Sequence, residues 1–293
     1  MRAPLAAGSG GLPALRTAGA NAATLVVAEG FTSTGPRLGL DLPVDLRGGD
    51  EEALTRLAAE LGFAWQHELR RVIEAAITRT KDEHTPWLKL PPLLILGEPG
   101  VGRTHVARRI AHLASLPHVT LDFSDPAGVE QLWPQVCGPD LLLPSLPVLA
   151  MAVGRCANPV VSVAGIECLE VATQQRFAAF IEPGSAARHV DYAAAGTLDL
   201  TQVNWMVQCS DVSAIAPKLL QLLRPIELHR PDVQALPLHV VEVLAEAAID
   251  LGLIDRLQHQ AGDALNDLCQ VAAHRSTAEI YKHARRWLQT HCQ

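Results

Sequence analysis

The segment that most constrains the fold is a glycine-containing loop between a short apolar run and an amphipathic stretch. Residues 91–96 are apolar over the length of one strand, and residues 105–114 carry apolar side chains at helical spacing. The loop between them, here called the glycine loop, reads Gly97-Glu98-Pro99-Gly100-Val101-Gly102-Arg103-Thr104. This order predicts a strand, a tight turn and a helix, which is the repeating unit of a parallel α/β sheet.

The glycine loop fits the phosphate-binding pattern G-x-x-x-x-G-K-[ST], except that Arg103 occupies the lysine position. Glycines let consecutive backbone N–H groups face a phosphate, and the following helix points its positive end at the same place. Arginine keeps the charge of lysine but is longer and forked. We therefore predict that all eight residues of the loop bind the phosphates of ATP, with the Thr104 hydroxyl as a ligand of Mg²⁺. The alternative is a turn that keeps its glycines for backbone geometry alone.

The composition limits the classes of function. The chain has 293 residues, enough for one large or two small domains, and 48% of them are hydrophobic. Its 31 acidic side chains outnumber its 24 Lys and Arg side chains, so we expect no nucleic-acid partner. The six cysteines include no C-x-x-C pair and are typical of reduced thiols in a cytoplasmic protein. No apolar run has the length of a transmembrane helix, so we expect no membrane partner.

The pattern of residue types predicts four successive regions. The first 48 residues are rich in Gly, Ala, Pro and Leu, which favours a flexible arm. The next region has apolar residues at helical spacing after Asp50, a helix cap, and Gly62 indicates a break between two helices. The predicted regions are a flexible N-terminal arm (1–48), a helical lead-in (49–84), an α/β domain (85–230) and a small all-helical C-terminal lid domain (231–293).

Within the α/β region, short apolar runs alternate with helical patterns. This alternation predicts a parallel sheet with flanking helices, which would bind its ligand at the carboxyl ends of the strands. The predicted strands are residues 93–96, 119–123, 160–164, 203–209 and 225–228.

Four segments beyond the glycine loop follow in an order that resembles a known family. The first is Asn158-Pro159-Val160 with the residues up to Glu167, and the second is Phe180-Ile181-Glu182-Pro183. The third is Asp191-Tyr192 with Leu198-Asp199-Leu200-Thr201-Gln202-Val203, and the fourth is Ile215-Ala216-Pro217-Lys218-Leu219-Leu220. With the glycine loop, they resemble the AAA+ ATPases, in particular the ATPase module of Lon-type proteases, over about residues 91–290. The resemblance implies a P-loop sheet followed by a helical lid.

The departures from that family concern the residues that hydrolyse ATP. The resemblance implies that the two Walker B carboxylates fall at Ala164 and Gly165, which carry none. Glu167 lies two residues further on, Ser210 takes the place of the sensor 1 asparagine, and Arg224 lies close to the arginine-finger position but out of register. These three are weak catalytic candidates. The segment Ser276-Thr277-Ala278 replaces the Gly-Val-Arg of sensor 2.

The missing groups lower the expected turnover. A missing general base slows a reaction by on the order of 10²–10⁴, and a missing arginine finger by on the order of 10³–10⁵. The resemblance therefore implies a pseudo-ATPase that binds ATP with little or no hydrolysis. It would act as a regulatory or assembly subunit whose partner is a second copy of the chain or an intact AAA+ paralogue. Two alternatives stay open: a weak or trans-activated ATPase that remodels proteins, and an interaction scaffold that binds no nucleotide.

Other polar groups give weaker signals. His112, His118 and His189 have no spacing that indicates a metal site. The last predicted helix is basic through His283, Arg285, Arg286 and His291. We interpret this stretch as a solvated helix face, with a contact to an acidic partner or a neighbouring subunit as the alternative.

Overall fold

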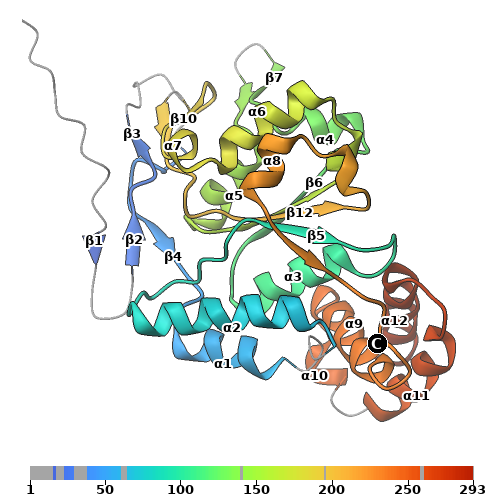
Figure 1. Ribbon diagram of the computed structural model, residues 1–293. Helices are drawn as coiled ribbons and strands as arrows, with labels where there is room; N and C mark the ends of the chain where they lie inside the picture. The colour runs from blue at the N-terminus through green and yellow to red at the C-terminus, as the bar shows by residue number, and fades with distance from the viewer. Residues whose placement is uncertain are drawn as a thin grey trace, which may run out of the picture.

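The computed structural model describes residues 16–17, 23–29, 38–60, 65–138, 141–194, 196–257 and 261–292. Within these residues, the main body is a five-stranded sheet with helices on both faces (Figure 1). Every neighbouring pair in the sheet is parallel. Across the sheet, the strands are β13 (Arg224–Glu227), β5 (Leu93–Leu96), β12 (Asn204–Cys209), β9 (Val160–Ala164) and β6 (His118–Asp122). The five predicted strands are confirmed to within one residue at each end.

Alternate residues of each strand face opposite layers of helices. In β5, Leu94 belongs to one apolar cluster, whereas Leu93 and Ile95 belong to the other. One layer contains α1 (Glu51–Ala59), α2 (His67–Asp82) and α3 (Arg103–Leu113), and the other contains α5 (Leu146–Gly154), α6 (Val171–Ile181) and α8 (Pro217–Leu222). Further short elements of the main body include α4 (Pro126–Glu130), α7 (Pro183–Ala186) and the hairpin of β7 (Gln135–Gly138) and β8 (Leu141–Leu143).

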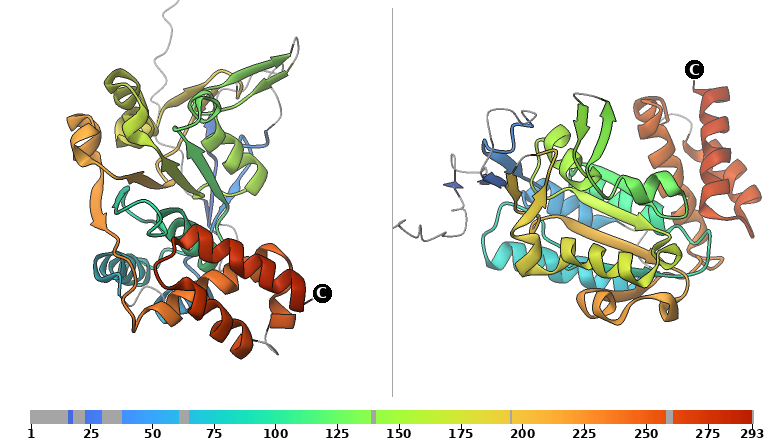
Figure 2. Two further views of the ribbon diagram at one scale, coloured as in Figure 1. Left: turned by 90° about the vertical axis from the view of Figure 1, so that its right-hand side faces the viewer. Right: turned by 90° about the horizontal axis from the view of Figure 1, so that it is seen from above.

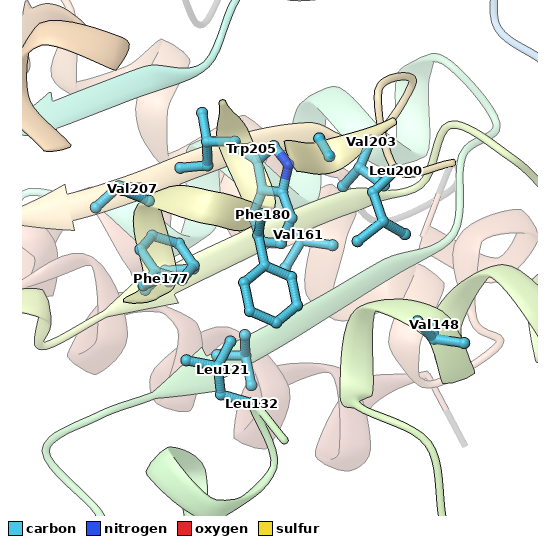
Figure 3. Close-up of a cluster of buried hydrophobic side chains, with 14 of the residues drawn as sticks. Leu121, Leu132, Val148, Val161, Phe177, Phe180, Leu200, Val203, Trp205 and Val207 are labelled. Carbon is cyan, nitrogen blue, oxygen red and sulfur yellow. The ribbon is translucent and has the colours of Figure 1, made fainter. Parts of the chain in front are cut away.

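Aromatic side chains attach α6 to the sheet (Figure 3). Phe177 and Phe180 meet the indole of Trp205 in edge-on contacts, with ring centroids 5.5 and 6.1 Å apart. All three side chains are buried. Burial of large rings in such contacts contributes strongly to a core, so these side chains attach α6 to the start of β12.

The described parts of the first 48 residues belong to the main body. Strand β3 (Ala28–Glu29) pairs with β11 (Gly196–Leu198), which in turn pairs with β10 (His189–Asp191). The strands β1 (Arg16–Thr17), β2 (Ala23–Leu25) and β4 (Val44–Leu46) form a second small sheet. The apolar side chains of Leu25, Val27, Leu40, Val44 and Leu46 are buried in the core around Trp205. The flexible arm predicted for 1–48 therefore does not describe residues 23–29 and 38–48, because their backbone pairing and burial fix them; residues 1–15, 18–22 and 30–37 lie outside the described residues.

The helical lead-in begins as the sequence predicts. The side chain of Asp50 caps α1 by accepting a hydrogen bond of 2.9 Å from the backbone N–H of Ala53. The predicted break at Gly62 lies outside the described residues. Helix α2 then packs against β13. The side chain of Glu68, in its first turn, accepts a hydrogen bond from the backbone N–H of Glu227. The lead-in is thus attached to the edge strand of the sheet.

The C-terminal helices gather beside the sheet and share an apolar core of their own (Figure 2). They are α9 (Leu236–Asp250), α10 (Ile254–Leu257), α11 (Ala261–Ala272) and α12 (Thr277–His291). The all-helical character predicted for this region is confirmed for its described residues. No helix in the described part of the chain is long and apolar enough to cross a lipid bilayer.

A polar patch interrupts the face of the sheet under α3. His118 lies 2.8 Å from the Ser162 hydroxyl, measured from Nε2 to Oγ, and Thr120 lies 2.9 Å from the same hydroxyl. Burial and the nearby charge of Arg108 lower the pKa of His118 to about 4. The folded protein therefore keeps this ring neutral at pH values where an unfolded chain protonates it.

We expect a His118→Gln variant to be less sensitive to acid than the wild type. Between pH 6.5 and pH 4 the unfolded wild type takes up a proton at His118 and the folded wild type does not, so its free energy of unfolding falls as the pH falls. The variant does not lose stability in this way. The difference in free energy of unfolding between wild type and variant should therefore change by about 2–3 kcal/mol over that pH range. Urea unfolding at pH 7, 5.5 and 4.5 measures it. If the free energies of unfolding of the two proteins fall in parallel as the pH is lowered, the pKa assigned to His118 is wrong.

Candidate functional site

The glycine loop adopts a backbone that few other residues tolerate. Gly97, Gly100 and Gly102 have φ angles of 149°, 87° and 101°. These values lie in the region that favours glycine because other residues place a Cβ too close to the backbone. Inside the loop, the N–H of Val101 donates a hydrogen bond of 3.2 Å to the carbonyl of Glu98. The loop therefore closes as a tight turn between β5 and α3.

The first turn of α3 offers backbone donors next to the loop. The helix begins at Arg103 after Gly102, which provides no side-chain cap. Because the first N–H groups of a helix have no partner inside the helix, those of Arg103, Thr104 and His105 remain available to a ligand. The helix dipole adds positive potential at the same end. This arrangement suits an anion.

A cavity of about 540 Å³ lies at this helix end. Small-molecule sites commonly have volumes of roughly 300–1,000 Å³. The C-terminal helices supply one wall of the cavity, and the glycine loop with the start of α3 supplies the other. Its charged lining has four cations, Arg103, Arg108, Lys282 and Arg285, and one carboxylate, Glu246. Its other lining residues are Gly100, Gly102, Thr104, His105, Gln208, Thr277, Ala278 and Tyr281.

Helix α12 begins directly against the glycine loop. The backbone N–H of Thr277 donates a hydrogen bond of 2.9 Å to the carbonyl of Gly100. A Cβ on Gly100 would lie 2.7 Å from the Cβ of Ser276, and a Cβ on Gly102 would lie 2.9 Å from the Thr277 hydroxyl. Two of the glycines are thus required by this close approach as well as by their φ angles.

The ends of two neighbouring strands bring polar side chains to the loop. Thr104 donates a hydrogen bond of 3.0 Å to Gln208 Oε1, and Arg103 Nη1 lies 3.5 Å from Ser210 Oγ. Ser210 donates from its hydroxyl (2.9 Å) and its backbone N–H (3.1 Å) to Glu167 Oε1. Three predicted site residues, Arg103, Ser210 and Glu167, therefore form one chain of contacts beside the cavity.

The remaining predicted site residues lie in different surroundings. Arg224 is exposed at the start of β13, paired in register with Leu93, so it lies at the end of the sheet away from the glycine loop. It does not line the cavity, and its role toward a neighbouring subunit stays a prediction. Glu98 forms an exposed ion pair of 3.2 Å with Arg230. Val101 is buried in the core beneath the loop.

The residues at the carboxyl end of β9 place no carboxylate next to the glycine loop. Gly165 has a φ of 69°, and a Cβ there would lie 2.7 Å from the backbone nitrogen of Ser124. The preceding residue, Ala164, accepts a backbone hydrogen bond from Phe123. The nearest acidic side chain along the chain, Glu167, is engaged by Ser210. The local packing therefore disfavours any side chain at Gly165, and Ala164 carries no carboxylate.

No activated sulfur nucleophile lies beside the described cavity. Burial, together with the charge of Glu167, raises the pKa of the Cys209 thiol to about 11, so the thiol stays protonated near neutral pH.

The neighbouring residue Gln208 indicates what the cavity can bind. It is buried, it lines the cavity, and within the described residues its Nε2 has no hydrogen-bond partner. A buried amide with unused donors is the kind of group that a ligand oxygen satisfies.

Sequence reasoning missed several cavity residues. Gln208 could have been noticed as a polar residue in an otherwise apolar strand. Arg285 belongs to the basic stretch that the sequence favours as a solvated face, and Lys282 directly precedes that stretch. Only tertiary packing turns these two side chains toward the glycine loop. Comparison with known proteins adds nothing to these assignments, since no family model matches the chain and no curated protein matches its sequence.

Proposed function

We propose that this chain is a P-loop protein of the AAA+ type, resembling the ATPase module of Lon-type proteases. In this proposal, it binds ATP between the glycine loop and the C-terminal helices and hydrolyses it little or not at all. Its role is that of a regulatory or assembly subunit, in contact with further copies of itself or with an intact AAA+ paralogue. The observation that carries the proposal is the cavity that combines an uncapped helix start with four cationic side chains.

The chemistry of the cavity suits a polyphosphate. Phosphate oxygens accept hydrogen bonds from backbone N–H groups at a helix start and from guanidinium groups. Arg103 takes part from the first residue of α3, Lys282 and Arg285 approach from α12, and Gln208 supplies free amide donors. Thr104 exchanges its hydrogen bond with Gln208 for a ligand position on Mg²⁺ when the nucleotide carries that ion.

The expected lack of hydrolysis rests on the surroundings of β9. Ala164 and Gly165 provide no carboxylate, and the tight packing of Gly165 against Ser124 disfavours a larger residue there. Glu167 accepts both hydrogen bonds of Ser210 and lies outside the cavity lining. A water molecule at the γ-phosphate would therefore have no free general base from the described part of this chain.

A specific observation also favours a second candidate function, an interaction scaffold without nucleotide. The contacts of Gly100 and Gly102 with Ser276 and Thr277 give these two glycines a purpose that needs no phosphate. A scaffold of this kind would keep the loop to join the sheet to α12. Measurement of nucleotide binding separates the two candidates.

Calorimetric titration of the purified full chain with ATP, with and without Mg²⁺, tests the proposal. We expect one site with a Kd in the micromolar range, and we expect an Arg103→Ala variant to bind at least about tenfold more weakly because it loses a charge-assisted hydrogen bond. An Arg188→Ala variant, which removes an exposed arginine outside the cavity, serves as the matched control and should bind as the wild type does.

Two results would overturn the proposal. One is the absence of any heat at millimolar ATP while circular dichroism shows an intact fold, which would favour the scaffold. The other is an equal loss of affinity in the Arg103→Ala and Arg188→Ala variants, which would mean that binding is not at the glycine loop. Turnover of bound ATP at a rate typical of motor ATPases would contradict the pseudo-ATPase part alone.

A further inference from the structure

A second polar cluster lies behind the cavity, buried between α3 and α9. It contains His105 from α3 and His239, Glu242 and Glu246 from α9, all of them buried. The three α9 residues follow one another at spacings of three and four, so they share one face of the helix. A buried group of four ionisable side chains requires partners that satisfy it.

Glu246 fixes the orientation of His105. Its Oε2 accepts a hydrogen bond from His105 Nδ1, and its Oε1 forms an ion pair of 3.0 Å with Arg108 Nε. A carboxylate therefore faces each ring nitrogen, Glu246 at Nδ1 and Glu242 on the side of Nε2. A metal ion that binds Nε2 takes the place of the proton that this nitrogen otherwise carries toward Glu242. Histidine ligands of metals are commonly held in this way, with one ring nitrogen bonded to a carboxylate and the other free for the metal.

The other side of the ring is where unpaired atoms converge. His105 Nε2 and Glu242 Oε1 are both buried and have no hydrogen-bond partner within the described residues. The nearest approach of the two side chains is 3.9 Å, from Nε2 to Oε2. One ligand atom each from His105, His239 and Glu242 lie within 4.8 Å of one another. Two unsatisfied buried atoms facing the same space indicate that a ligand belongs there.

The charges around this space favour a cation. Arg108 pairs with Glu246, and Arg109 forms an ion pair of 2.7 Å with Glu60. Glu60 also lies within hydrogen-bonding reach of Glu242, which brings two carboxyl groups together. Among the described residues, the ion pair of Glu242 is with His105 alone. A divalent ion would supply the positive charge that the arginines do not.

We propose that His105, His239 and Glu242 bind one Zn²⁺ ion, with Glu246 as the carboxylate that orients His105. Two imidazoles and one carboxylate are a common protein ligand set for zinc, and they leave a fourth tetrahedral position for water. Zinc bonds of about 2.0–2.1 Å place neighbouring ligand atoms roughly 3.3 Å apart. The three atoms, which lie within 4.8 Å of one another, therefore move closer by at most about 1.5 Å when the ion enters. The ion joins α3, and with it the glycine loop, to the C-terminal helices.

The site is accessible in spite of its burial. His105 and Glu246 line the cavity at the glycine loop, and His239 lines a smaller cavity of about 240 Å³ on the other side of Thr277. The Thr277 hydroxyl lies 3.0 Å from His239 Nε2, and it also lies 2.9 Å from the place that a Cβ on Gly102 would occupy. The proposed ion is therefore next to the candidate nucleotide site and shares the lining residues His105 and Glu246 with it, whereas His239 and Glu242 lie outside that lining. The proposal stands without nucleotide binding.

Titration of the full chain with Zn²⁺ in a chelator-treated, nucleotide-free buffer tests the site. We expect one Zn²⁺ per chain with submicromolar affinity, a rise in Tm on binding, and the visible absorption of tetrahedral Co²⁺ when cobalt replaces zinc. His239→Gln and Glu242→Gln should each weaken binding by at least about a hundredfold, and Glu246→Gln by about 10–100-fold, because it loses only the orienting contact. The matched control, His112→Gln, changes a histidine of α3 outside the cluster and should bind as the wild type does.

The proposal is wrong if the wild type binds Zn²⁺ no tighter than tens of micromolar, since adventitious surface histidines bind in that range. It is also wrong if His112→Gln weakens binding as much as His239→Gln does. Because the cobalt spectrum and the stoichiometry are read on the wild type, the test does not depend on the variants folding. A proton on His105 Nε2 is the alternative occupant of the space, and in that case cobalt gives only the weak spectrum of the hydrated ion.

Discussion

Replacing Gly100 by alanine is expected to lower the free energy of unfolding by about 3 kcal/mol, through backbone strain and a steric clash together. The residue has a φ of 87°, and the added Cβ would lie 2.7 Å from the Cβ of Ser276. Neither atom is the end of a flexible side chain, so the loop and the start of α12 must separate. The hydrogen bond from Thr277 N–H to Gly100 carbonyl should weaken with them. Urea unfolding measures the stability, and hydrogen exchange at the Thr277 amide measures the local contact.

The chain provides two controls that separate these causes. Gly252 has a φ of 66° but no heavy atom within 4 Å of the place that a Cβ would occupy, so Gly252→Ala should show the strain alone, about 1–2 kcal/mol. Gly184, in α7, has open space and no such φ, so Gly184→Ala should be neutral or slightly stabilising. If Gly100→Ala loses no more stability than Gly252→Ala, the loop and α12 are not in contact in solution.

The sheet could be predicted from the sequence because its strands are buried on both faces. Such strands are continuous apolar runs, and here proline or glycine bounds them, as at Pro92 and Gly97 around β5. The segments that hold β2, β3 and β4 contain only brief apolar runs, such as residues 24–28, between stretches rich in Gly, Ala and Pro. Their pairing is decided by tertiary contacts, such as that of β3 with β11, whereas composition alone favours a flexible arm.

Helix α9 shows why the candidate sites were only partly predictable. The apolar residues at 240, 241, 244 and 248 follow the spacing of one helix face, which predicts that Val241 is buried. In the structure Val241 is 47% exposed, whereas Glu242 and Glu246 are only 4% and 7% exposed. A hydrophobic pattern cannot anticipate a polar cluster in which the partner of Glu246, His105, is 141 residues away in sequence. The glycine loop was recognisable because its residues are consecutive, whereas Gln208, Lys282 and Arg285 reach the same cavity only through the folded arrangement.

Replacing Asn158 by leucine is expected to lower the free energy of unfolding by about 3–5 kcal/mol, because it leaves buried backbone groups unpaired. This fully buried amide accepts a hydrogen bond of 3.0 Å from the N–H of Arg47. It donates two hydrogen bonds of 2.9 Å, to the carbonyls of Arg47 and Leu88. One side chain thus joins the N-terminal segment, the connection before β5 and the start of β9.

The expected loss in free energy of unfolding exceeds that of a single hydrogen bond because two buried backbone groups lose their partners. Leucine has nearly the shape of asparagine, so the packing is kept, but the N–H of Arg47 and the carbonyl of Leu88 lose their partners away from water. The carbonyl of Arg47 still accepts from the N–H of Leu88 at 2.9 Å. The matched control is Gln175→Leu, an exposed amide on α6, which should change stability by less than about 0.5 kcal/mol. A similar small effect for Asn158→Leu in urea unfolding would mean that the N-terminal segment is not fixed to the sheet through this amide.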